Sequence, residues 1–82
     1  MTIKDIIINE NYDCIDIRVT SPEGWKEDSI LVGCCRSENG ELIPLDGDIY
    51  SDSEAVLSSS VWKNEALGIK NGLTVLLQGE WL

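Results

Sequence analysis

Four carboxylates follow one another within residues 46–54 with no base between them: Asp46, Asp48, Asp52 and Glu54. Oxygen ligands this close together suggest a calcium loop of the EF-hand type. That loop has oxygen ligands at positions one, three and five, glycine at six and glutamate at twelve. Counted from Asp46, position five is Tyr50, position six is Ser51 and position twelve is Leu57. The segment therefore predicts no metal site, and a weak cation site is kept only as an alternative.

Paired carboxylates can also act as general acid and base, provided that burial raises the pKa of one of them. A domain of this size has little volume for the cleft that this would need. The chain contains no histidine, which excludes Ser-His-Asp and Cys-His catalysis and zinc sites that mix Cys with His. It also lacks the glycine-rich loops that bind phosphate. The sequence thus predicts a protein that is not an enzyme and needs no cofactor.

Three cysteines, Cys14, Cys34 and Cys35, are an odd number without a C-x-x-C spacing. This pattern fits neither a disulfide framework nor a structural zinc site. In a strand, adjacent side chains point to opposite faces, so one thiol of the Cys34–Cys35 pair should be buried and the other more exposed. We expect a packing role for this pair. A redox switch, with Arg36 lowering a thiol pKa, is the alternative.

A longer acidic stretch surrounds the opening segment. From residue 37 to residue 62 the chain has six acids and no base. Residues 46–54 alone carry about one charge per 7–8 Å of extended chain, far below the one per roughly 1.7 Å of duplex DNA. Only acids from several strands could therefore form a dense negative face. The predicted binding face combines these acids with an aromatic anchor: Glu38, Glu41, Asp46, Asp48, Tyr50, Asp52 and Glu54.

Length and charge limit the remaining possibilities. The 82 residues form one domain, 1–82, with a hydrophobic share of 43% and a net charge of -9, which favours a folded and soluble protein. Such a charge disfavours nucleic acid and anionic membranes and favours a basic or mixed protein surface as partner. The N-terminal segment has no signal-peptide pattern, so we expect a cytoplasmic protein with reduced thiols.

Turn residues separate short segments rich in β-branched residues. Candidate strands cover 3–9, 12–20, 29–36, 41–45, 55–63 and 73–81. In the second, alternation places Ile15, Ile17 and Val19 on the buried face and Tyr12, Cys14, Asp16 and Arg18 on the other. Asn39-Gly40 predicts a tight hairpin turn, and a second pair, Asn71-Gly72, is expected to open the last strand. Pro44 limits its strand to an edge or to an early end.

The segment 52–64 allows two structures. Ser51 and Glu54 fit a capping box that would start a helix near Asp52. The run of three serines followed by valine is poor helix material, and we favour a strand. The predicted fold is all-β, a small antiparallel barrel or a curled meander of five to six strands. The alternative is α+β with one helix at about 52–64.

The segments LIPLDGDIYSDSEAV and NGLTVLLQGEWL, within residues 42–82, resemble parts of small uncharacterised accessory proteins of bacterial mobile elements. Proteins of that sort often bind and block another protein, and the resemblance implies no functional residue. We expect a non-catalytic, acidic protein-interaction module with exposed aromatic anchors such as Tyr50 and Trp81. The alternatives are a homo-oligomer that pairs through an edge strand, and a weak cation binder.

Overall fold

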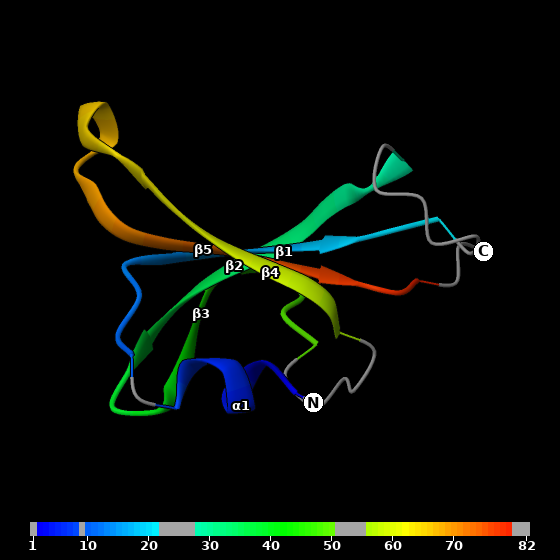
Figure 1. The fold of residues 1–82 in the computed structure, drawn as a ribbon, viewed down its shortest axis with the longest axis horizontal. Coiled ribbons are helices and arrows are strands. Elements are labelled where there is room, and N and C mark those ends of the chain that lie inside the picture. Colours follow the sequence, from blue (N-terminus) through cyan, green and yellow to red (C-terminus); the bar gives the residue numbers. More distant parts are fainter. Residues whose placement is uncertain (1, 9, 22–27, 51–55, 80–82) are drawn as a thin grey trace.

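The computed structural model describes residues 2–8, 10–21, 28–50 and 56–79 (Figure 1). These residues form one five-stranded sheet in the order β3-β2-β1-β5-β4. The predicted all-β fold with five strands is confirmed. The strands and their bounds are β1 (Cys14–Val19), β2 (Ile30–Glu38), β3 (Glu41–Gly47), β4 (Val56–Asn64) and β5 (Ile69–Leu77).

The sheet is mixed and strongly twisted. β1 pairs with β2, β2 with β3, and β4 with β5 in antiparallel fashion, whereas β1 and β5 run parallel. In Figure 1 the strands cross one another at steep angles around β1 and β5. Within the described residues β3 and β4 form the two edges and do not pair with each other. The architecture is therefore an open, curled meander and not a closed barrel.

The predicted first strand, 3–9, is wrong, because Ile3–Ile7 forms a short helix, α1. Its start is fixed by Asp5, whose carboxylate accepts hydrogen bonds from the Thr2 backbone N–H at 2.7 Å and from the Thr2 hydroxyl at 3.1 Å. Ile3 and Ile7 are four residues apart, so both lie on one face of the helix, and both are fully buried. The helical spacing of these isoleucines was present in the sequence, but the run of β-branched residues concealed it.

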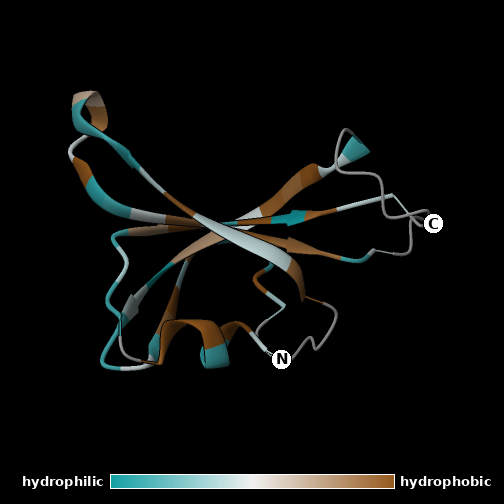
Figure 2. Ribbon diagram, viewed as in Figure 1, coloured by the Kyte–Doolittle hydropathy of each residue, from teal (hydrophilic) through white to brown (hydrophobic). Residues whose placement is uncertain are grey.

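The core lies between α1 and one face of the sheet. Ile15 and Ile17 of β1, Cys35 of β2 and Val75 of β5 are fully buried in the same cluster as the two helix isoleucines. Figure 2 shows hydrophobic residues along α1 and along the central strands. The predicted burial of Ile15 and Ile17 is confirmed, and Val19 packs at the margin of the cluster.

Tyr12 departs from the predicted alternation. The alternation predicts that Tyr12 lies on the same side as Cys14 and Asp16, away from the core, yet Tyr12 is buried in the core. β1 begins only at Cys14, so the two-residue period does not extend back to Tyr12. Its backbone N–H donates to the Ser37 hydroxyl at 2.7 Å, and its carbonyl accepts from the Ser37 N–H at 3.0 Å. These bonds tie the segment before β1 to the end of β2.

The two Asn-Gly pairs behave differently. Asn39 and Gly40 have φ of 53° and 81° and form the predicted turn between β2 and β3. Asn71-Gly72 does not open β5, which already begins at Ile69 after the short 3-10 helix η2 (Glu65–Leu67) and Gly68 at φ 73°. The Asp13 carboxylate accepts the N–H groups of Lys70 and Asn71 and fixes this part of the strand as extended.

The ambiguous segment is a strand wherever the structure describes it. β4 covers Val56–Asn64, so the predicted strand is confirmed and the alternative helix is absent from residues 56–64. The capping box at 51–54 lies outside the described residues. β4 pairs along its length with β5, with register shifts near each end. Local propensity did not determine whether this segment is a helix or a strand. Pairing with the hydrophobic strand β5 makes it a strand.

Candidate interaction surfaces

The predicted acids lie on the hairpin formed by β2 and β3 and on the segment after it. Glu38, Glu41, Asp46 and Asp48 are all exposed, as is Tyr50. Asp52 and Glu54 lie outside the described residues, as does the predicted anchor Trp81. The structure thus places five of the seven predicted face residues on one edge of the sheet.

The register shows which acids share a face. Glu38 pairs with Glu41 at the hairpin end, and Asp46 pairs with Cys34. These residues alternate with the core-facing Ser37 and Cys35, so they lie on the sheet face opposite α1. Asp46 lies five positions along the strand from Glu41, a distance of roughly 16 Å. The acids therefore form two pairs near the two ends of β3, Glu38 with Glu41 and Asp46 with Asp48, and not one continuous patch.

Asp16 is an acid of this face that the sequence did not indicate. It pairs with Cys34 of β2, which in turn pairs with Asp46 of β3. Asp16 and Asp46 are thus two strands apart on the same side of the sheet, roughly 10 Å from each other. Nothing in the local sequence could place residues 16 and 46 together, because their proximity depends on the strand order.

Apolar side chains flank the second acidic pair. Leu45 is 53% exposed and Tyr50 is 45% exposed. Leu45 occupies a break in the β2–β3 register between Pro44 and Asp46. Tyr50 has a φ of 47°, and its N–H donates to the Asp48 carboxylate at 3.3 Å. We name these four residues, Leu45, Asp46, Asp48 and Tyr50, the β3-edge surface.

Two glycines hold the segment after β3 against β2. The Asp48 N–H donates to the Val32 carbonyl at 3.1 Å. A Cβ on Gly33 would lie 2.4 Å from the Asp48 carbonyl oxygen, and one on Gly47 would lie 2.3 Å from the Val32 carbonyl oxygen. Gly47 also has a φ of 67°. Backbone contact this close requires glycine at both sites. It also holds the chain in place after β3, where Asp48 and Tyr50 follow the strand.

The first acidic pair is partly neutralised. Arg36 forms an ion pair with Glu38 at 3.1 Å, with side chains 44% and 53% exposed. An exposed pair of this kind contributes at most about 1 kcal/mol to stability, but it places a cation at the hairpin end. The negative potential of this edge is consequently strongest at Asp46 and Asp48.

The cysteines follow the predicted packing arrangement. Cys35 is fully buried, Cys34 is half-buried, and all three thiols are free. Burial, followed by the neighbouring cysteines, raises the pKa of Cys35 to about 11. Burial and the Asp16 carboxylate raise the pKa of Cys14 to about 11. These shifts oppose thiolate formation at Cys14 and Cys35 at neutral pH.

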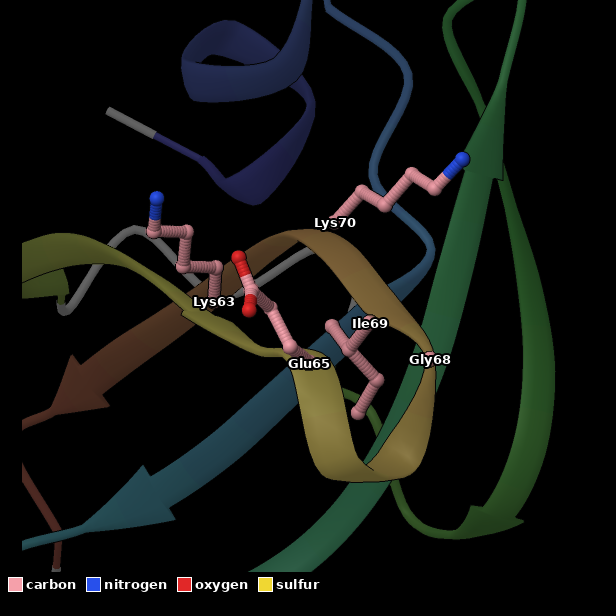
Figure 3. A pocket seen from close by; sticks show the side chains of 5 residues that line it. All are labelled: Lys63, Glu65, Gly68, Ile69 and Lys70. Carbon is pink, nitrogen blue, oxygen red and sulfur yellow. The ribbon is translucent and has the colours of Figure 1, made fainter.

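A separate hollow of about 430 Å³ lies at the β4–β5 turn, bordered by Lys63, Glu65, Gly68, Ile69 and Lys70. Figure 3 shows the two lysine side chains pointing away from each other, with Glu65 between them. An anion-binding site requires donors that converge on one point. The diverging amines and the carboxylate between them do not provide this. The position of both lysines beside one hollow could not be predicted from the sequence.

No three His, Cys, Asp or Glu side chains gather into a possible metal site among the residues that the structure describes. In the same part of the chain, no helix has the length and apolar character needed to cross a membrane. Compared with protein-family models, with curated proteins and with solved structures, the chain matches none of them. The surfaces described above therefore carry the functional argument.

Proposed function

We propose that this protein is a non-catalytic interaction module whose β3-edge surface binds a basic or mixed protein surface. One observation carries the proposal: two exposed carboxylates, Asp46 and Asp48, are close neighbours in the chain of two exposed apolar residues, Leu45 and Tyr50. Protein interfaces combine an apolar or aromatic centre with a polar rim in this way.

The charge of the whole molecule supports the same partner class. A net charge of -9 produces a negative field that attracts basic surfaces and accelerates encounter with them. The same field opposes approach to nucleic acid. We place this activity in the cytoplasm, where free thiols remain reduced, and an accessory protein that blocks a partner's basic surface would use such an edge.

The test is affinity capture from a lysate of the cells that make the protein, at low and at moderate salt. We expect a basic partner to be retained by the natural chain and to be lost when Asp46→Asn and Asp48→Asn are combined. Leu45→Ser with Tyr50→Ser should weaken capture independently of salt. The matched control is Glu10→Gln with Glu65→Gln, which removes two exposed carboxylates elsewhere and should leave capture unchanged.

The two pairs of substitutions separate a specific surface from net charge. If the control pair reduces capture as much as the Asp46 and Asp48 pair, net charge alone is responsible and the β3-edge surface is not the binding site. If no partner is retained at either salt concentration, the proposal loses its basis. Circular dichroism of each variant confirms that the sheet is intact.

A further inference from the structure

The two edges of the sheet differ in how they are protected against pairing. β3 contains Pro44, a register shift at Leu45 and two acids, Glu41 and Asp46. Proline, irregularity and charge are the usual means by which an edge strand is kept from pairing with another chain. β4 has none of these in its centre. It is nine residues long, contains no proline and carries a single charged residue, Lys63, near its end.

β4 also exposes apolar side chains. Val61 is 70% exposed and Leu57 is 47% exposed, and no other strand pairs with the outer side of β4 in the part of the chain that is described. Between its two register shifts, β4 keeps a regular pairing with β5 from Ser58 to Trp62. An exposed, regular strand with unpaired backbone groups is a template for a further strand.

We propose that β4 pairs with β4 of a second copy of this chain, antiparallel and across a two-fold axis at Ser59. In such a pair, Ser59 of one copy lies opposite Ser59 of the other copy. A residue before Ser59 in one copy lies opposite the residue equally far after Ser59 in the other. Ser58 then lies opposite Ser60, and Leu57, at the register shift, lies opposite Val61. Serine thus pairs with serine and an apolar residue with an apolar residue. The two exposed apolar side chains, Leu57 and Val61, cover each other.

Self-pairing of β4 about Ser59 matches side chains better than self-pairing about Ser60 or self-pairing of β3. An axis at Ser60 would place Leu57 opposite Lys63 and Ser58 opposite Trp62, which pairs unlike side chains. Self-pairing of β3 about Pro44 would place Leu42 opposite Asp46. In a chain of charge -9, self-association must avoid bringing carboxylates together, and β4 is the edge strand that contains no carboxylate.

The test measures molar mass by light scattering across a concentration series, from about 1 µM to about 1 mM, the range expected of a small and weak interface. The variants are Ser59→Asp and Ser59→Lys. Ser59 is exposed, so both should fold, which circular dichroism checks. Across a two-fold axis either substitution places like charges opposite each other. We therefore expect both variants to remain monomeric where the natural chain is a dimer, a weakening of at least tenfold.

Mixing the two variants gives the decisive measurement. A mixture of Ser59→Asp and Ser59→Lys chains should regain the dimer mass, because opposite charges then face each other at the axis. Asn39→Asp adds the same charge at the distant β2–β3 turn and should leave dimerisation unchanged. The proposal is overturned if the natural chain is a monomer at the highest concentration, if only one of the Ser59 variants dissociates, or if the mixture stays monomeric.

This inference is independent of the proposed function. The Ser59 variants leave Leu45, Asp46, Asp48 and Tyr50 unchanged, and the variants of the β3-edge surface leave β4 unchanged. Failure of dimerisation with partner capture intact would refute the β4 pairing alone. Loss of partner capture with the dimer intact would refute the β3-edge proposal alone.

Discussion

At the scale of single residues, the adjacent thiols Cys34 and Cys35 have opposite surroundings because a strand alternates its side chains between two faces. The sequence was sufficient to predict this arrangement. It could not indicate which thiol is buried, because that depends on which face of β2 is turned toward the core. Cys35 is on that face because it pairs with the buried Ile15 of β1. Burial then makes Cys35 a small hydrophobic residue and removes it from thiol chemistry near neutral pH.

The raised thiol pKa values predict slow alkylation. A rise from 9.0 to about 11 lowers the thiolate fraction of Cys14 and Cys35 at pH 8 by about 100-fold. We expect both residues to react with iodoacetamide more slowly in the native protein than in denaturant, as measured by mass spectrometry of tryptic peptides. Native modification of Cys35 at the denatured rate would contradict its burial.

The same shift sets the sign of a pH effect. The folded state favours the neutral thiols, so their contribution to stability is complete below the unfolded pKa of about 9. It decreases as the pH rises from about 9 through about 11. Urea unfolding at pH 8 and pH 10.5 should show this loss in the natural chain and a smaller loss in Cys35→Ala. An equal loss in both chains would remove Cys35 as the cause.

At the scale of elements, α1 shows how a short helix can matter more than its length indicates. Five residues form only a marginal helix by themselves. Ile3 and Ile7 nevertheless close one side of the core, and the Thr2–Asp5 hydrogen bonds hold the first turn. The sequence prediction failed here because β-branched residues favour strands on average, whereas the four-residue spacing of Ile3 and Ile7 lets both residues enter the core cluster as a helix.

Adjacent isoleucines provide a direct test of this role. Ile7 is fully buried and Ile8 is 68% exposed. We expect Ile7→Ala to lower the free energy of unfolding by about 2–5 kcal/mol, and Ile8→Ala to change it by less than about 0.5 kcal/mol. Urea denaturation followed by tryptophan fluorescence measures both. Equal effects of the two substitutions would show that α1 does not cover the core as described.

At the scale of the whole molecule, charge opposes compactness. Fifteen acids face six bases, and in the described residues the side chains form one ion pair within 4 Å, Arg36–Glu38. Folding brings the carboxylates closer together, so their mutual repulsion destabilises the folded state. The protein tolerates this cost because β-branched and leucine side chains fill the core between α1 and the sheet.

Screening this repulsion should stabilise the fold. We expect the melting temperature to rise as NaCl is increased from about 10 mM to about 300 mM, which shortens the Debye length from about 30 Å to below 8 Å. Glu41→Gln combined with Asp46→Asn should raise the melting temperature at low salt and reduce its salt dependence. A melting temperature that falls with added salt would show that attractive charge pairs dominate instead.

The sequence by itself determined the all-β class, the burial of Ile15 and Ile17, the Asn39-Gly40 turn and the absence of histidine chemistry. These features depend on residue type, on a two-residue period or on a local turn, all of which operate within a few positions of the chain. Only the tertiary structure decided that β1 and β5 run parallel, that Asp16 joins Asp46 on one face, and that β4 lies at an edge of the sheet that the described residues form. Each of these depends on which distant strands become neighbours, and strand order is set by packing of the whole core rather than by any single segment.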